Sequence, residues 1–124
     1  PYRHDRYAHE IYGQDAPYDG ILLSRAVLDD SPAKLRAIQD AGSVHAYLRL
    51  PDPGRVLGDC GAFSYWQQEN PPYSTADMVD FYEGLGFDWG VSVDHLIFSH
   101  DDAERRRRHE LTLANAESLL EHHN

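Results

Sequence analysis

Short blocks of apolar residues alternate along this chain with polar, turn-forming segments, and their spacing predicts strands and helices in alternation. Four segments have the apolar pattern of strands: residues 20–28, 44–50, 56–63 and 89–93. Three segments have helical spacing: residues 31–42, 74–86 and about 102–121. This order of elements predicts an α/β fold with parallel strands, about half of a barrel or of an open sheet.

Local signals set the ends of the predicted helices. Ser74 with Asp77 resembles a capping box at the start of the second helix, and Gly84 and Gly86 are expected to end it. Five apolar residues form the stripe by which the last helix is expected to be buried: Leu111, Leu113, Ala116, Leu119 and Leu120. Residues 1–19 have no clear periodicity and predict a leader or loop, which leaves residues 20–124 as a partial β/α domain.

The length and composition limit the class of protein. With 124 residues, 41% of them apolar, the chain has the length of one domain. It begins without an initiator Met and ends just beyond a helical pattern, so we interpret it as a piece of a longer protein. No signal-peptide pattern or bilayer-length apolar run occurs in these residues, which predicts a cytoplasmic protein with no membrane contact.

Charge and cysteine content narrow the chemistry. Cys60 is the single cysteine, so these residues form neither a disulfide nor a cysteine-based zinc site, and a buried thiol is its expected role. The net charge of −10 argues against this part of the protein gripping a phosphate backbone unaided. The basic run at 105–108 stands beside acidic residues and is interpreted as the solvated face of a helix.

Two aspartates stand where predicted strands end, and they carry the functional argument. Asp59 follows the apolar run at 56–58, and Asp94 follows the run at 90–93, with one predicted helix between them. A strand, helix and strand in this order make the two strands parallel, so both carboxylates are expected at the carboxyl edge of the sheet. Ligands bind at that edge in parallel α/β folds. Phe63 follows small residues after Asp59, and this combination suits a flat heterocycle with N–H donors.

Other interpretations of these residues stay open at this point. A strand-end aspartate also caps helices or accepts hydrogen bonds from loop amides. The cluster of Asp94, His95 and His100 fits a mononuclear metal site, as in a metal-dependent barrel hydrolase. A binding module for purines without catalysis is a further alternative.

The segment Asp59-Cys60-Gly61-Ala62-Phe63 resembles the Asp-Ser-Gly-Gly-Phe/Tyr-Gln signature of tRNA-guanine transglycosylases. Residues 69–74 and 86–95 are closer still to the DpdA-like branch, which is associated with inserting 7-deazaguanine bases into DNA. The resemblance spans about residues 18–121 and is densest from 58 to 95. It implies the N-terminal portion of a TIM (β/α)8 barrel that exchanges guanine in DNA for a 7-deazaguanine base of the preQ0 type.

The resemblance also implies roles for individual residues. Asp59 matches the general acid/base, Asp94 the carboxylate that recognises the purine edge, and Phe63 the ring that stacks on the base. Three further motif positions would bind the substrate: Cys60, Gly61 and Ser64. The family's nucleophilic Asp has no counterpart in this chain, so these residues alone are expected to be inactive.

The implied partners are DNA, a 7-deazaguanine base and the proteins of a DNA-modification system, with no cofactor bound by these residues. A zinc site, as in the tRNA enzymes, would belong to a later part of the protein. Cys60, Ala62 and Ser64 stand where the tRNA enzymes have Ser, Gly and Gln, which leaves the incoming base open. The alternative within the same chemistry is exchange on tRNA.

Overall fold

A three-stranded parallel sheet forms the centre of the structure, which is a computed structural model describing residues 6–123. The strands lie in the order β1 (Gly20–Ser24), β2 (Arg55–Asp59) and β3 (Trp89–Gly90). The register pairs Ser24 with Asp59 at one end of β1 and β2, and Gly58 with Gly90 between β2 and β3. The prediction of parallel strands in a mixed helix and strand fold is therefore confirmed.

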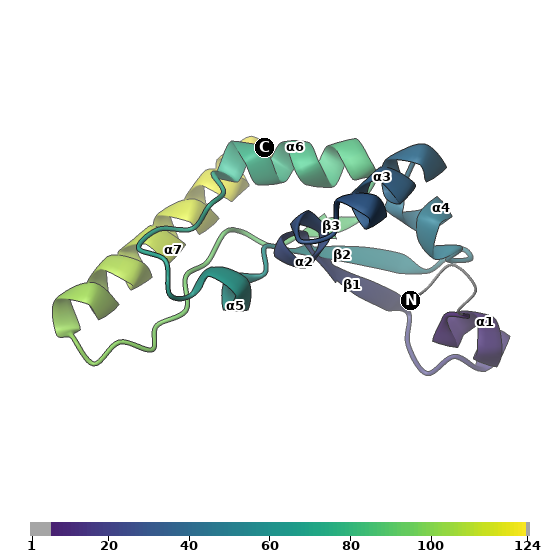
Figure 1. Cartoon of the computed structure of the whole chain (residues 1–124), viewed down its shortest axis with the longest axis horizontal. Helices are drawn as coiled ribbons and strands as arrows, with labels where there is room; N and C mark the ends of the chain where they lie inside the picture. The colour runs from purple at the N-terminus through teal and green to yellow at the C-terminus, as the bar shows by residue number, and fades with distance from the viewer. Residues whose placement is uncertain (1–5, 124) are drawn as a thin grey trace.

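Helices connect the strands and cover one face of the sheet. Their bounds are α1 (Ala8–Tyr12), the 3-10 turn η1 (Gly13–Asp15), α2 (Arg25–Asp29), α3 (Pro32–Ala41), α4 (Val44–Leu48), α5 (Ala62–Tyr65), α6 (Thr75–Leu85) and α7 (Asp102–His123). Figure 1 shows α3, α4 and α6 on one side of the strands, with α7 at the end away from α1. No helix in residues 6–123 is long and apolar enough to cross a membrane.

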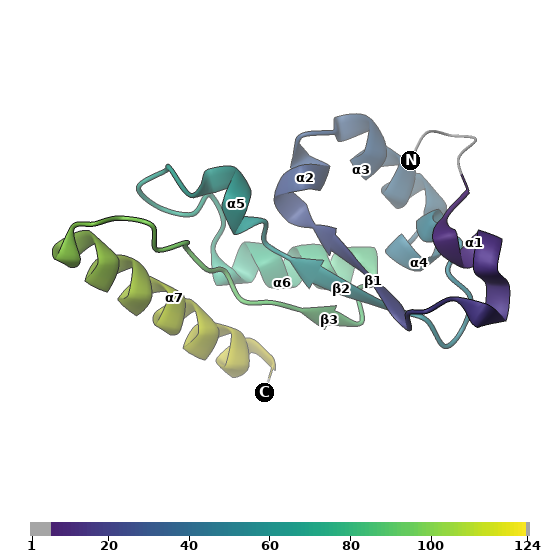
Figure 2. The ribbon, with the colours of Figure 1, turned by 90° about the horizontal axis from the view of Figure 1, so that it is seen from below.

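The opposite face of the sheet is open in the part of the chain that the structure describes. In the view from below, the strands lie in front of α6 without a helix over them (Figure 2). Leu22, Leu57 and Trp89 pair in register across the three strands and so share one face. Leu22 and Trp89 are 56% and 60% exposed, so an apolar row lies on this open face.

The helix-covered face buries two adjoining core clusters. The first joins α2, α3, α4, β2 and α6, and Ile38, Val44 and Val56 at its centre are fully buried. The second lies under the carboxyl ends of the strands and contains Cys60, Tyr65, Met78, Tyr82 and Val93, among others. The second cluster therefore supports the edge at which the two aspartates were expected.

One aromatic ring packs directly on paired glycines. Gly58 and Gly90 face each other across β2 and β3, and the ring of Tyr82 from α6 covers both. A Cβ added at Gly58 would lie 2.2 Å from Cε1 of Tyr82, and one at Gly90 would lie 2.3 Å from Cδ2. The Tyr82 hydroxyl donates to the carbonyl oxygen of Val91 at 3.0 Å. The absence of side chains at these two positions thus allows α6 to approach the sheet.

Three of the predicted strands are shorter than expected, and one is a helix. Residues 44–48 form α4 because the Ser43 hydroxyl accepts from the amide of Ala46 at 3.1 Å and caps the helix, and Val44 and Leu48 are buried one turn apart. The strand predicted for 20–28 ends at Ser24, after which residues 25–29 form α2. The segments 56–63 and 89–93 likewise contain only the shorter β2 and β3, and α5 begins at residue 62.

The predicted helix ends are partly confirmed. Ser74 and Asp77 form the capping box of α6, and Gly86 ends the helix in the left-handed conformation, whereas Gly84 lies inside it. The predicted buried stripe of α7 is wrong for Leu113 and Leu120, which are 52% and 63% exposed, whereas Leu111, Ala116 and Leu119 are half-buried. The single buried residue of α7 in the described range is Arg108.

The N-terminal segment contains helical structure within the range expected to be a leader or loop. Residues 1–5 lie outside the described residues, but α1 packs beside α4. His9 Nε2 donates to the carbonyl oxygen of Leu48 at 3.0 Å, and Arg49 Nε donates to Glu10 at 2.6 Å. This hydrogen bond from Arg49 is the main reason that the pKa of Glu10 falls to about 2. The division into a leader and a partial β/α domain stays a prediction.

Candidate active site

The structure brings the two aspartates to the same edge of the sheet. Asp59 is the last residue of β2, and Asp94 lies four residues beyond the end of β3. Cys60, which directly follows Asp59, donates its thiol proton to Oδ1 of Asp94, with a distance of 2.8 Å from Sγ. The carboxyl ends of two neighbouring parallel strands therefore meet here, as the sequence pattern predicts.

Asp59 is half buried and uses one of its carboxylate oxygens in the local turn. Oδ2 accepts from the amide of Gly61 at 2.9 Å. Within residues 6–123, no hydrogen-bond partner contacts Oδ1. Asp59 thus fills the loop-amide role considered above, while one oxygen stays available for another group.

Gly61 is required by local packing. Its φ of +84° lies in the left-handed region, and an added Cβ would lie 2.3 Å from the Ser24 hydroxyl oxygen and 2.6 Å from Cβ of Ala26. The amide of Ala26 donates to the carbonyl oxygen of Cys60 at 3.3 Å. The small residue therefore allows the turns after β1 and β2 to approach each other, and this close approach fixes the backbone that follows Asp59.

Cys60 is a buried thiol, as expected. Its side chain is 0% exposed, and burial, followed by the hydrogen bond to Asp94, raises the pKa of the thiol to about 11. The thiol therefore stays protonated at neutral pH, which makes it a poor nucleophile and a hydrogen-bond donor. Because the side chain is buried against Asp94, any contribution of Cys60 to substrate binding acts through that carboxylate.

Phe63 and Ser64 lie on the accessible side of the same edge. Phe63 is 76% exposed, and its ring centroid lies 6.3 Å from that of Phe98. Ser64 is exposed as well and donates its amide to the carbonyl oxygen of Gly61 at 2.9 Å. Trp66 packs edge-on against Phe98 at 5.6 Å between ring centroids. Aromatic rings from the segments after β2 and after β3 thus pack against one another.

His95 is part of the scaffold under this edge. It is 2% exposed, its Nε2 donates to the carbonyl oxygen of Gln68 at 2.8 Å, and its Nδ1 accepts from Arg108 at 2.9 Å. These partners require a neutral ring with the proton on Nε2. Both ring nitrogens are engaged, so His95 offers neither of them to a metal ion. The alternative of a metal site therefore lacks His95 as a ligand. In the described range, no group of three or more His, Cys, Asp or Glu residues is arranged so that it could hold a metal ion.

Two arginines of α7 hold the loops of the site together. The interpretation of the sequence did not assign them this role. Arg108 is 8% exposed, and its Nη1 lies 2.6 Å from the carbonyl oxygen of Trp66 and 2.8 Å from that of Leu96. Arg107 donates to the backbone carbonyl of Glu69 and to the side chain of Asn70. The interpretation of residues 105–108 as a solvated helix face is wrong for these two positions.

The charge pattern of the basic run contains a signal for this role. Glu104 stands one turn before Arg108, which donates to it at 2.6 Å, and Arg107 donates to it at 2.9 Å. These hydrogen bonds, with that of Arg107 the larger, lower the pKa of Glu104 to about 2. Because Glu104 binds both Arg107 and Arg108, this part of the basic run is a fixed cluster of charged side chains and not a solvated helix face.

The comparison with known proteins adds a second line of support. Over 137 aligned residues, covering 95% of this chain, the sequence is 39% identical to a DNA-guanine transglycosylase of Salmonella montevideo. The chain is similar to a DNA-guanine transglycosylase. This similarity confirms the resemblance that the motif at 59–63 indicates. The chain spans about a third of the length of that relative, 32%. No protein-family model matches the chain.

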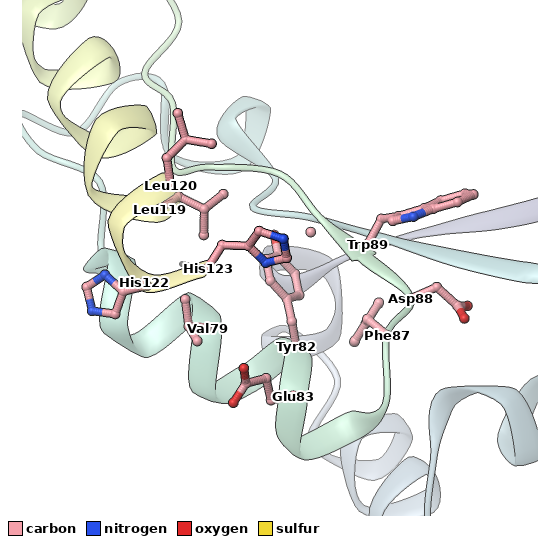
Figure 3. A pocket seen from close by; sticks show the side chains of 11 residues that line it. Val79, Tyr82, Glu83, Phe87, Asp88, Trp89, Leu119, Leu120, His122 and His123 are labelled. Atoms are coloured by element: carbon pink, nitrogen blue, oxygen red, sulfur yellow. The ribbon is translucent and has the colours of Figure 1, made fainter.

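A cavity of about 440 Å³ lies elsewhere in the fold. It is bounded by α6, by the segment that contains β3 and by the end of α7, and side chains such as Val79, Tyr82, Leu119 and His123 surround it (Figure 3). Neither Asp59 nor Asp94 lines it. The cavity adjoins β3 itself, whereas Asp59 is the last residue of β2 and Asp94 lies beyond β3, so the two sites are distinct.

Proposed function

We propose that this chain is the N-terminal part of an enzyme that exchanges guanine in DNA for a 7-deazaguanine base. The observation that carries the proposal is the 39% identity, over 95% of the chain, to a protein named as a DNA-guanine transglycosylase. The meeting of Asp59 and Asp94 at the carboxyl edge of the sheet supports it. A base exchange needs one carboxylate to move protons and another to recognise the base, and this edge supplies both.

Asp59 is the proposed general acid/base. Its half-buried carboxylate is held through Oδ2 by the Gly61 amide, which leaves Oδ1 to accept or return a proton. The outgoing guanine needs a proton as its bond to C1′ breaks. The incoming base must lose its N9 proton before that nitrogen attacks C1′. One carboxylate at a fixed position can serve both steps in turn.

The nucleophile of this proposal lies in the rest of the enzyme. An aspartate there would attack C1′ and form a covalent glycosyl intermediate, which divides one difficult exchange into two easier displacements. The chain corresponds to about a third of the length of its relative, which leaves room for such a residue outside it. The segment alone is therefore proposed to be inactive.

Base recognition is assigned to Asp94 and Phe63. A carboxylate pairs with the adjacent ring N–H and amino groups of a guanine-like edge much as it pairs with the two N–H groups of arginine. The exposed Phe63 ring provides a face for stacking on the same base. Because a base inside duplex DNA is stacked, the exchange also requires flipping, which costs a few kcal/mol. The phosphate contacts that stabilise the flipped state are proposed to lie outside this acidic segment.

The open face of the sheet supports the proposal that these strands begin a TIM barrel. A barrel buries the inner face of its sheet by closing on itself, and the inward side chains are bulky and apolar. The row of Leu22, Leu57 and Trp89 has that character and lies on the face without helices, while the helices lie on the outer face, as a barrel requires.

The decisive test is a base-exchange assay with the complete protein that contains this segment. Labelled guanine and labelled 7-deazaguanine are offered with duplex DNA and with tRNA in separate reactions. We expect label to enter DNA, and we expect Asp59→Asn to lower the rate by about 10²–10⁴-fold, the range for loss of general acid–base catalysis. Asp80→Asn, on the exposed side of α6, is the matched control and should keep the wild-type rate.

The alternatives are outcomes of the same assay. Label entering only tRNA would move the reaction to that substrate. Binding of the free base without incorporation into either polymer would indicate a purine-binding module. A full exchange rate in Asp59→Asn would remove this residue from the chemistry.

A further inference from the structure

We infer that Cys60, supported by Tyr65, is a positioning residue that fixes the orientation of the Asp94 carboxylate and so sets its affinity for the purine edge. The inference rests on the proposed function of Asp94 as the base-recognising carboxylate. It gives a role to the two buried groups of the site that the proposed chemistry does not itself use.

In the contact between Cys60 and Asp94, the thiol is fully buried. Sγ lies 2.8 Å from Oδ1 of Asp94, and the Cys60 side chain is 0% exposed. Water therefore does not compete for the thiol proton, and the raised pKa of the thiol keeps that proton in place at neutral pH. A donor in a fixed place restricts rotation of the carboxylate about its terminal bond, which is otherwise broad for aspartate.

The Tyr65 hydroxyl lies between the thiol and the backbone carbonyl of Asp94, and it shares its one proton between these two acceptors. Its hydroxyl oxygen lies 3.0 Å from Sγ of Cys60 and 2.9 Å from the carbonyl oxygen of Asp94. The ring is 2% exposed and packs edge-on against Tyr73 and His95, with centroids 6.0 Å away in each case. One rigid side chain thus links the turn after β2 to the segment after β3.

This arrangement leaves the carboxylate able to bind a base with both oxygens. Each carboxylate oxygen has two lone pairs, so Oδ1 can accept from the thiol and from a second donor. Within the described residues, no partner contacts Oδ2 of Asp94. A purine edge with two parallel donors requires both oxygens to lie in its plane. Fixing that plane before the base arrives lowers the entropy lost on binding.

The test compares Cys60→Ser, Cys60→Ala and Tyr65→Phe in the complete protein. The first variant keeps a donor at this position, the second removes it, and the third removes the hydroxyl that holds it. We expect Cys60→Ala to raise the Kd for free 7-deazaguanine, measured by calorimetry, and its KM in exchange by about tenfold, the loss of one charge-assisted hydrogen bond. The kcat at saturating base should change less than threefold, roughly, and Cys60→Ser should restore most of the affinity.

Tyr82→Phe is the matched control for Tyr65→Phe. Both rings are buried in the same core cluster, but the Tyr82 hydroxyl donates to Val91 and not to the Cys60–Asp94 pair. We expect Tyr65→Phe to weaken base binding by several-fold and Tyr82→Phe to leave it unchanged. Equal effects of the two variants would mean that general packing, and not the link to Asp94, determines base affinity, and would overturn the inference.

An infrared measurement tests the hydrogen bond without activity. The wild-type spectrum minus that of Cys60→Ser isolates the S–H stretching band of Cys60. Removing the acceptor with Asp94→Ala should move this band to higher wavenumber, as for a thiol freed from a strong acceptor. An unmoved band would show that the thiol does not donate to Asp94, and the inference would fail whatever the binding data.

The outcomes separate this inference from the proposed function. Exchange by the wild-type protein with equal base affinity in Cys60→Ala would leave the function standing and overturn the positioning role. Base binding without exchange, weakened tenfold in Cys60→Ala, would support the positioning role and overturn the proposed reaction. Absence of both base binding and exchange would overturn both.

Discussion

The packing of Tyr82 on Gly58 and Gly90 makes a sharp prediction about stability. In Gly90→Ala, the new Cβ would have to move from 2.3 Å to at least 3.4 Å from the Tyr82 ring, so α6 or the ring must shift. Overpacking of this kind costs about 1–3 kcal/mol, and loss of the hydrogen bond from Tyr82 to Val91 adds about 0.5–1.5 kcal/mol. The lower entropy of the unfolded chain offsets about 0.4–1 kcal/mol. We therefore expect the free energy of unfolding to fall by about 2–3 kcal/mol, and Gly58→Ala to behave alike.

Gly84 provides the internal control, because it lies inside α6 with no atom within 4 Å of an added Cβ. Gly84→Ala should raise the free energy of unfolding by about 0.5–1 kcal/mol. The three variants are compared by urea unfolding followed by circular dichroism. In a Tyr82→Leu background the penalty of Gly90→Ala should shrink, since the obstructing ring is gone. The packing argument is refuted if Gly90→Ala is as harmless as Gly84→Ala, or if its penalty is the same with and without the ring.

Three further predictions address the site and its support. Phe63→Ala should weaken base binding by about 1–3 kcal/mol in calorimetry, whereas Phe63→Tyr keeps the stacking face; unchanged binding in Phe63→Ala would exclude stacking. Arg108→Met should lower the free energy of unfolding by about 1.5–3 kcal/mol in urea titrations, because it removes the hydrogen bonds of Arg108 to the backbone of Trp66 and Leu96. The same change at the exposed Arg106 should stay within about 0.5 kcal/mol, and equal effects would contradict this stabilising role of Arg108. The folded chain keeps the Cys60 proton up to a pKa of about 11, whereas the unfolded chain loses it at lower pH. The free energy of unfolding of the wild-type protein should therefore fall between pH 9 and pH 11 by about 2–3 kcal/mol more than that of Cys60→Ser. Parallel pH curves for the two proteins would show that the thiol titrates normally.

The elements that the sequence predicts well are those determined by residues that are neighbours in the sequence. The capping box of Ser74 and Asp77 satisfies amide groups of the first turn of α6, and a glycine such as Gly86 is favoured in the left-handed conformation that ends the helix. The parallel order of β2 and β3 follows from the helical crossover between them. The placement of both aspartates at one edge follows from that order, so the position of the site could be predicted without knowledge of distant contacts.

The elements that the sequence mispredicts depend on contacts between distant residues or on very short patterns. Val44 and Leu48 satisfy a helical spacing, but in five residues this pattern overlaps with the alternation of a strand, and the cap by Ser43 decides the outcome. Arg108 could not be recognised as buried, because its partners Trp66 and His95 are brought to it by the fold. The position of Asp94 was predictable, whereas its hydrogen bond to Cys60 was not.

The edge of the sheet divides into a rigid part and an accessible part, and the proposed base exchange would use both. Beneath the edge, Cys60, Tyr65 and Val93 are almost fully buried in one core cluster. The Cys60 thiol contacts the carboxylate of Asp94, and the Tyr65 hydroxyl contacts its backbone carbonyl. On the accessible side of the edge, Phe63 and Ser64 are exposed, and the proposed function requires such access because a base must enter and leave. A recognising group must keep its geometry between the departure of one base and the arrival of the next, which requires support from packed side chains. A stacking ring needs only access, so the proposed function assigns different purposes to the buried and the exposed residues of one short segment, 59–65.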